Sequence, residues 1–258
     1  MTLDKVSLTF SRHLWEGAAV SKLASADSGV PTLAVSTVIF TLRPNQAGAM
    51  QLAIALVRRI KEPYLGLWAL PGGPLSMNED LATTASRNLL ETTGLHPRYL
   101  EQLYAFGNLD RSPNDLAEDR VVSIVYWALV GSEEAAEAVE GENVQWFWAD
   151  QLDPLAFDHS LIVEYALWRL RNKLEYSRLA HGFLGERFTL AQLREVYEAV
   201  LGRALDPGNF RRMVQGNGAV VATNERLEGT RHRPPKLYRY DSSIDLTDQG
   251  PLNTGERK

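Results

Sequence analysis

The apolar and polar positions follow a strand period in the first half of the chain and mostly a helix period in the second half. Apolar and β-branched runs bounded by turn residues predict strands over 33–42, 50–58, 99–108, 121–130 and 144–148. Apolar residues spaced three and four apart predict helices over 80–93, 160–174, 190–201 and 207–215. Two short runs, 219–223 and 236–240, predict a last pair of strands. This order of elements indicates an α+β protein.

A glycine turn, a helix and a second glycine turn over residues 67–95 organise the first half. Gly72 and Gly73 let the chain turn sharply off a strand, because residues with a Cβ resist such backbone angles. Asp80 favours a helix N-terminus, and Gly94 favours a helix end. One face of the predicted helix is an apolar stripe of Leu81, Ala85 and Leu89. Another face is polar and carries Thr84, Asn88, Glu91 and Thr92.

This stretch resembles the Nudix box, whose pattern is a Gly, a Glu six residues later, an Arg eight further on, and a carboxylate-rich helix end. The positions that match are Gly73, Glu79, Arg87, Leu89, Glu91, Gly94 and Leu95. Two carboxylates of the pattern are absent, and Asn88 and Thr92 stand in their places. The resemblance implies a site for nucleoside diphosphates and a second-shell ion pair between Glu79 and Arg87.

The two departures weaken the metal chemistry of the box. Mg²⁺ prefers carboxylate, phosphate and water oxygens, and neutral side chains cannot offset its charge. Only Glu91 remains as a metal ligand, so we expect weak Mg²⁺ binding at most, no required cofactor and no catalytic residue. The alternative is an active pyrophosphatase in which another acidic residue replaces the lost ones.

The same turn is a suitable place for phosphate, because backbone N–H groups lie near a helix N-terminus. Arg58, Arg111 and Arg120 are candidate contacts for the anionic group. Trp68 is a candidate contact for the base, and a core position is equally open to it. The full set of candidate ligand-binding residues is Arg58, Trp68, Pro71, Gly72, Gly73, Glu79, Arg87, Glu91, Arg111 and Arg120.

The predicted helices of the second half are marked by their ends. Thr189 and Gln192 form a capping box, and Asp206-Pro207 starts the next helix. In this last helix the apolar residues expected to point inward are Phe210, Met213 and Val214. The residues left to face outward are Asn209, Arg211, Arg212 and Gln215. A basic loop between the final strands adds Thr230, Arg231, Arg233 and Lys236.

Two helices across a tight turn, followed by a basic hairpin, predict a winged helix-turn-helix that binds double-stranded DNA. In this arrangement the second helix reads base edges and the wing holds phosphates. The competing interpretation is a solvated basic face on a helical appendage. Just before the helix over 160–174, which we expect to join the domains, stand Asp158 and His159. A helix cap with a hydrogen-bonded histidine is favoured there over a catalytic pair.

Composition adds limits to this interpretation. A chain of 258 residues favours two domains, and the absence of cysteine excludes disulfides and thiolate metal sites. The net charge of -5 argues against a protein that coats nucleic acid, although residues 211–239 are locally basic. No run of 18 apolar residues is present, and residues 1–17 lack the apolar core of a signal peptide. We therefore expect a cytoplasmic protein with no membrane partner.

Taken together, the segments LWALPGG, LAFDH, FTLAQLREVYEAVLG, LDPGNFRRM and RPPKLYRY resemble the Nudix-related transcriptional regulators of NAD metabolism, the NrtR family. The resemblance implies a Nudix-like α/β/α sandwich with a mixed sheet, followed by a C-terminal winged helix. It also implies ADP-ribose or a related nucleotide as effector, and a homodimer that represses NAD-biosynthesis genes from a palindromic operator. A pyrophosphatase and a nucleotide sensor acting on a protein partner are the alternatives.

The expected domains follow from these assignments. Residues 1–30 have no clear periodicity, 31–154 form the Nudix-like domain, and 155–176 form the connecting helix. The winged helix occupies 177–241. Residues 242–258 are polar without a core-forming pattern and are expected to be a disordered tail.

Overall fold

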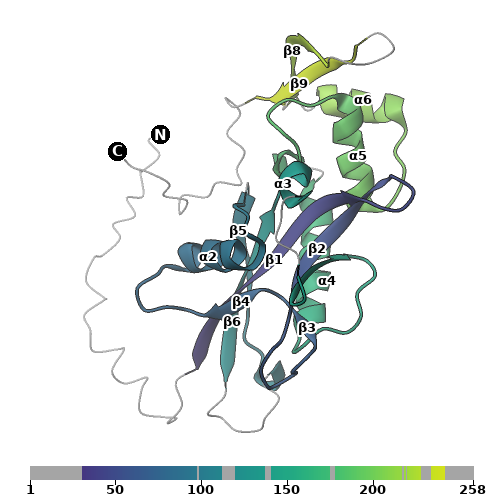
Figure 1. Cartoon of the computed structure of the whole chain (residues 1–258). Helices are drawn as coiled ribbons and strands as arrows, with labels where there is room; N and C mark the ends of the chain where they lie inside the picture. The colour runs from purple at the N-terminus through teal and green to yellow at the C-terminus, as the bar shows by residue number, and fades with distance from the viewer. Residues whose placement is uncertain are drawn as a thin grey trace, which may run out of the picture.

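The computed structural model describes residues 31–97, 99–111, 120–136, 141–174, 178–216, 218, 220–227 and 234–241. The expectations for residues 1–30 and 242–258 lie outside this part of the chain. Within it, the first seven strands form one mixed sheet, with β1 and β6 parallel and the other pairs antiparallel (Figure 1). The path is β3-β2-β1-β6-β5, with β4 paired to β1 and β7 paired to β2.

Five strands of this sheet lie close to the predicted ranges, and the short strands β3 and β4 were not predicted. The strands are β1 (Thr32–Pro44), β2 (Met50–Arg58), β3 (Trp68–Ala69), β4 (Gly72–Pro74), β5 (Tyr99–Phe106), β6 (Val121–Leu129) and β7 (Val144–Trp148). β5 is shorter than predicted, since residues 107–108 lead into the short 3-10 helix η1 (Leu109–Arg111). A short helix, α3 (Ser132–Ala136), follows β6.

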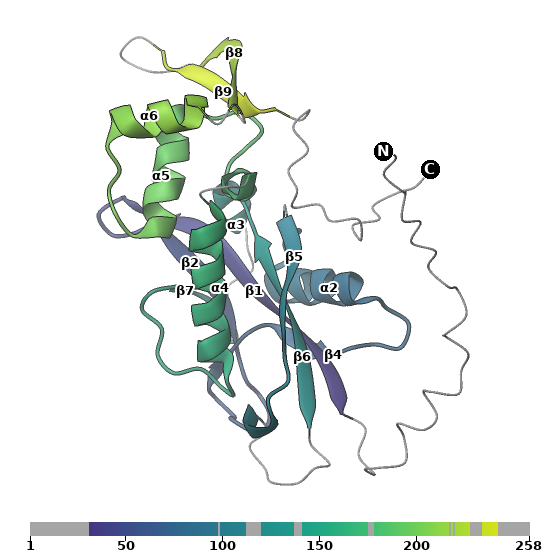
Figure 2. The same cartoon turned by 180° about the vertical axis from the view of Figure 1, so that it is seen from behind.

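Helices cover both faces of the sheet, which makes the α/β/α sandwich (Figures 1 and 2). On one face α2 (Leu81–Thr93) packs Ala85 against Val35 of β1. On the other face α4 (His159–Leu174) packs in one cluster with Val38 and Phe40 of β1. Successive side chains of a strand point to opposite faces, so a strand buried on both faces is apolar at nearly every position.

The helix expected to join the domains, α4, is also a layer of the sandwich. Its buried stripe is Ile162, Val163, Ala166, Leu167, Leu170 and Leu174, in the same cluster as the sheet residues. This cluster continues into the second half of the chain, where it includes Val196 and Val200 of α5 (Leu190–Leu201). One apolar core thus runs through both halves.

The second half is the predicted winged helix. The 3-10 helix η3 (Arg178–Phe183) leads into α5, whose capping box is formed by Thr189 and Gln192. After the turn come α6 (Pro207–Gly216) and the strand pair β8 (Val220–Arg226) and β9 (Lys236–Tyr240). Phe188 adds a backbone bridge to Tyr238. No helix of the described ranges is long and apolar enough to span a membrane.

Candidate functional site

The box helix is held at both ends as its sequence predicts. The Asp80 carboxylate caps α2 by accepting from the Thr83 N–H at 2.7 Å, and Gly94 ends it with φ of 73°. Glu79 accepts hydrogen bonds from Arg87 Nε at 2.9 Å and from Thr84 Oγ1 at 3.0 Å. The hydrogen bond from Arg87 holds the pKa of Glu79 below its usual value. The expected ion pair of the box is present.

Asn88 and Glu91 of the box are already bonded to other groups of the protein. Asn88 is buried, and its Nδ2 donates to the Val35 carbonyl at 3.1 Å while its Oδ1 accepts from Arg87 at 3.3 Å. The Glu91 carboxylate is exposed and pairs with Arg87 at 3.1 Å. Within the described residues there is no group of three or more His, Asp or Glu that could hold a metal. Glu79 and Glu91 share the guanidinium of Arg87, and Asn88 supplies no charge. The donor set therefore lacks the cluster of carboxylate oxygens that Mg²⁺ prefers.

The expectation of one shared polar face on α2 was wrong in detail. Thr84 and Asn88 are buried against the sheet, whereas Glu91 points to solvent. The helix packs on β1 and β4. Thr84 and Asn88, which are four residues apart, therefore face the interior and do not form an open ligand-binding face.

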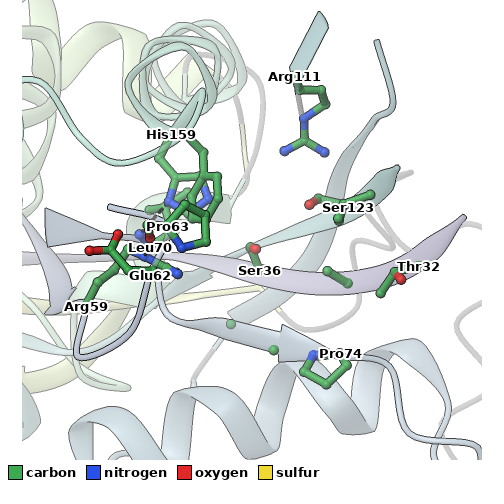
Figure 3. A pocket seen from close by; sticks show the side chains of 15 residues that line it. Thr32, Ser36, Arg59, Glu62, Pro63, Leu70, Pro74, Arg111, Ser123 and His159 are labelled. Atoms are coloured by element: carbon green, nitrogen blue, oxygen red, sulfur yellow. Dashed lines mark hydrogen bonds between the residues drawn. The ribbon is translucent and has the colours of Figure 1, made fainter. Parts of the chain in front are cut away.

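A cavity of about 700 Å³ lies on the other face of the sheet, where α4 begins. Its wall comes from β1, β6, the β2–β3 loop, the glycine turn, η1 and the first turn of α4. It is lined by Thr32, Ala34, Ser36, Arg59, Glu62, Pro63, Leu70, Gly72, Gly73, Pro74, Arg111, Val121, Ser123, Phe157 and His159. Figure 3 shows Arg59, Glu62 and Pro63 gathered near His159, and the Arg111 guanidinium turned toward the strands that carry Ser36 and Ser123.

Two arginines supply the positive charge of this cavity. Arg111 is almost fully buried and forms a two-pronged pair with Asp158, with N···O distances of 2.7 and 2.8 Å. Its Nη1 donates to the Phe106 carbonyl at 2.6 Å. Arg59 lies over the Phe157 ring at 4.5 Å, with its Nε donating to the Pro63 carbonyl at 2.7 Å. A planar guanidinium held in this way suits phosphate or carboxylate.

His159 closes the floor of the cavity. Its Nδ1 accepts the Leu70 N–H at 2.9 Å, and burial lowers the pKa of the imidazole to about 4. The histidine is therefore neutral and hydrogen-bonded, as expected. The expected cap by Asp158 was wrong, because the carboxylate turns to Arg111 and only the Asp158 carbonyl accepts from the helix, at Ile162.

Gly72 is required by a close approach of two strands. A Cβ at this position would lie 2.7 Å from the Val35 carbonyl oxygen and 2.8 Å from Ser36 Oγ. At Gly73 the nearest atom to such a Cβ would be Asn88 Oδ1, at 4.0 Å. A side chain is therefore sterically excluded at Gly72 but not at Gly73.

The cavity gathers three of the ten candidate ligand residues, namely Gly72, Gly73 and Arg111. The other seven, Arg58, Trp68, Pro71, Glu79, Arg87, Glu91 and Arg120, do not line it. Arg58 is exposed and its Nε donates to the Gly66 carbonyl at 3.3 Å, so the neighbouring Arg59 reaches the cavity instead. Trp68 packs edge-on against Phe147 at 4.8 Å, which is the core position left open for it.

Arg59 and Phe157 line the cavity but were not predicted as ligand-binding residues. Arg58 and Arg59 follow one another at the end of a strand, and nothing in the sequence shows which of two adjacent side chains faces a cavity. Phe157 belongs to the LAFDH segment, and its position directly before Asp158 and His159 was a usable signal.

The predicted DNA-facing residues of α6 lie on its exposed side. Asn209, Arg211, Arg212 and Gln215 are exposed, whereas Phe210 and Val214 are buried. Met213 was expected to point inward but is 38% exposed. The buried residues of this short helix are Phe210 and Val214, which lie on a single ridge. Arg212 donates to Asn209. Lys236 is exposed at the start of β9, and Thr230, Arg231 and Arg233 lie outside the described residues.

A Nudix domain joined to a winged helix defines a class, the Nudix-related transcriptional regulators. Residues 32–166 match the NUDIX domain family, and residues 180–240 match the NrtR DNA-binding winged helix domain. The chain is 34% identical over 232 residues to the ADPR responsive transcriptional repressor NtrR of Acinetobacter baylyi, covering 87% of this chain and 88% of that protein. The chain belongs to the NrtR family.

Solved structures and a hydrolase complete the comparison. The crystal structure of Shewanella oneidensis NrtR is 35% identical with a TM-score of 0.69, covering 81% of this chain and 94% of that one. The same protein complexed with a 27mer DNA gives a TM-score of 0.67, at 35% identity and over 81% and 93% of the two chains. An ADP-ribose pyrophosphatase of Methanocaldococcus jannaschii is 32% identical over 117 residues, 45% of this chain and 67% of that protein.

Proposed function

We propose that the protein represses NAD-biosynthesis genes as a homodimer on a palindromic operator, with ADP-ribose or a related nucleotide as its effector. One observation carries this proposal. A Nudix cavity with two arginines but no metal-binding carboxylate cluster in the described chain shares one apolar core with a winged helix. Such a chain is built to bind a nucleotide and to report its binding, rather than to cleave it.

The cavity has the chemistry that a nucleotide with a diphosphate needs. Its volume of about 700 Å³ lies within the usual range for small-molecule sites, roughly 300–1,000 Å³. Arg59 and Arg111 suit the phosphates, and the Phe157 ring suits a base or ribose face. Ser36 and Ser123 offer hydroxyls for the sugar. The name of the Acinetobacter baylyi relative, ADPR responsive, favours ADP-ribose among such ligands.

The DNA interface we propose consists of α6 and the wing. Arg211 and Arg212 on the exposed face of α6 can each donate two hydrogen bonds to a guanine. Lys236 stands beside the wing, where phosphate contact is expected. The match of residues 180–240 to the NrtR DNA-binding winged helix domain supports this interface, and a relative has been solved in complex with a 27mer DNA. A protein that reads chromosomal operators works in the cytoplasm.

A pyrophosphatase is the second candidate, favoured by the similarity to the Methanocaldococcus jannaschii enzyme. Asn88 argues against it, because a buried amide bonded to the Val35 carbonyl supplies no negative charge for a metal. We expect negligible hydrolysis of ADP-ribose with Mg²⁺ or Mn²⁺. Turnover on the order of 1 s⁻¹ or more, the common enzyme range, would favour the enzyme instead.

The test is enrichment of DNA by the purified protein. Fragments of the genome that encodes the protein are incubated with it in the presence and absence of ADP-ribose, and the bound fragments are sequenced. We expect a palindromic site upstream of NAD-biosynthesis genes, with occupancy that changes when ADP-ribose is present. Light scattering on the same preparation should give the mass of a dimer. Enrichment of no fragment would refute the repressor assignment.

Point variants then test the interface itself. Arg212→Ala should relax sequence preference at one operator position and cost about 1–3 kcal/mol. Lys236→Ala should weaken binding to operator and scrambled duplex alike and flatten the salt dependence. The matched control is Arg169→Ala, which removes an exposed arginine from α4. If both interface variants bind like this control, α6 and the wing are not the DNA-binding surface.

A further inference from the structure

The pair of Arg111 and Asp158 places a carboxylate of the protein's own on a guanidinium that lines the cavity. Arg111 is 7% exposed and Asp158 is 21% exposed, and two parallel N–H···O bonds join them. A third N–H group of Arg111 is bound to the Phe106 carbonyl. The guanidinium that lines the cavity is thus mostly engaged before any ligand arrives.

Asp158 also stands where a helix cap would be. It immediately precedes α4, and its carbonyl accepts the N–H of Ile162 at 3.2 Å. Aspartate at such a position commonly accepts a hydrogen bond from the N–H of the second or third helical residue. Here the carboxylate is turned away to Arg111. Asp158 therefore has two competing partners, the guanidinium and the first turn of α4.

The far end of α4 is bound to the winged helix. Arg171 Nε donates to the Val200 carbonyl of α5 at 2.9 Å, and the Tyr197 hydroxyl donates to the Leu174 carbonyl at 3.0 Å. A helix of 16 residues is about 24 Å long at 1.5 Å per residue. Its first turn lines the effector cavity and its last turn holds the helix that precedes α6.

We propose that Asp158 is an internal counter-anion that a ligand phosphate replaces at Arg111, and that α4 conveys this exchange to the winged helix. When phosphate takes Arg111, the Asp158 carboxylate is released to cap α4. The cavity then selects ligands whose anionic group can compete with a carboxylate. This inference rests on the proposed effector function and specifies which residue makes the site responsive.

The exchange predicts a gain of affinity when the internal anion is removed. Asp158→Asn keeps the shape of the side chain but cannot form the two-pronged charged pair. If Asp158 occupies Arg111 in about nine of ten molecules, the variant should bind ADP-ribose about tenfold more tightly. Adenosine, which has no phosphate, should bind the variant and the wild type within twofold of one another.

The experiment measures ADP-ribose and adenosine binding by calorimetry, and operator binding by fluorescence anisotropy with and without ADP-ribose. The control is Asp153→Asn, which removes the same charge from an exposed position of the loop before α4. In Asp158→Asn the operator affinity without ligand should move toward the ligand-bound value of the wild type. In Arg171→Ala both ligands should still bind, and the effect of ADP-ribose on operator affinity should shrink at least twofold.

The outcomes separate the inference from the function on which it rests. If Asp158 only positions Arg111, the Asp158→Asn variant binds ADP-ribose more weakly or equally, and the inference is overturned while the effector function stands. Equal tightening for adenosine overturns it as well. A wild-type protein that binds operator but no ADP-ribose overturns both. Should Asp158→Asn fail to melt cooperatively, Asp158→Ser is used, since serine is also a good helix cap.

Discussion

Lowering the pH should destabilise the protein through His159. The imidazole is 7% exposed, and its unprotonated Nδ1 accepts the Leu70 N–H. Burial is the main cause that lowers its pKa from 6.5 to about 4, and the nearby charges of Arg111 and Arg59 act in the same direction against that of Asp158. Protonation would place a charge in the core and break this hydrogen bond.

The sign follows from the two pKa values. Below pH 6.5 the unfolded chain takes up a proton at this residue, and the folded chain does not until about pH 4. The free energy of unfolding therefore falls with pH across this window and levels off below it. A difference of about 2.5 units corresponds to about 3 kcal/mol over the whole window, and about 2 kcal/mol is lost between pH 7.5 and pH 5.

Glu79 and Asp80 do not obscure this effect. Hydrogen bonds from Arg87 and from Thr83 lower the pKa values of Glu79 and Asp80, respectively. Such groups stabilise the fold above their unfolded values, near 4.5 and 3.8, and lose this contribution as the pH falls further. Their effect therefore lies mainly below the window of His159.

The assay is urea unfolding followed by tryptophan fluorescence at pH 7.5, 6.5, 5.5 and 5.0. His159→Asn is the matched variant, because its Oδ1 can still accept the Leu70 N–H but the side chain does not titrate. We expect the wild type to lose about 2 kcal/mol from pH 7.5 to pH 5, and the variant to lose much less. Parallel pH profiles for the two proteins would refute the reasoning.

Three further predictions concern single positions. Gly72→Ala should cost about 1–3 kcal/mol in denaturant unfolding and weaken ADP-ribose binding, because its methyl would lie 2.7 Å from the Val35 carbonyl oxygen, whereas Gly73→Ala should leave the free energy of unfolding nearly unchanged. Asn88→Ala should cost about 1–3 kcal/mol by leaving that same carbonyl without the amide donor, and a melting temperature equal to that of the wild type would contradict this. Phe210→Ala should cost about 3–5 kcal/mol in the same urea assay, since the ring is buried against Tyr197 at 5.2 Å, and we expect loss of operator binding with ADP-ribose binding retained.

Local signals in the sequence determined most of the elements and their class. The strand-like runs predicted β2, β7 and β9 to the residue. In β2 the signal is strongest, because a strand buried on both faces has to be apolar at nearly every position. The capping box of Thr189 and Gln192 marked the start of α5, because such caps are satisfied within one turn. Each of these features depends on residues that are near one another in the chain.

The composition of the site could not be read in this way. The ion pair of Arg111 and Asp158 joins residues that are 47 positions apart in the sequence. The hydrogen bond between Leu70 and His159 joins residues that are 89 positions apart. The spacing of the box predicted an open ligand face on α2, but the packing of α2 against β1 buried Asn88 and placed the cavity on the opposite face of the sheet. Which of two adjacent arginines reaches the cavity was likewise decided by the orientation of the strand. Sequence periodicity indicates which side chains lie on one face of a helix or strand. The tertiary contacts decide whether that face packs against the sheet, lines a cavity or is exposed to solvent.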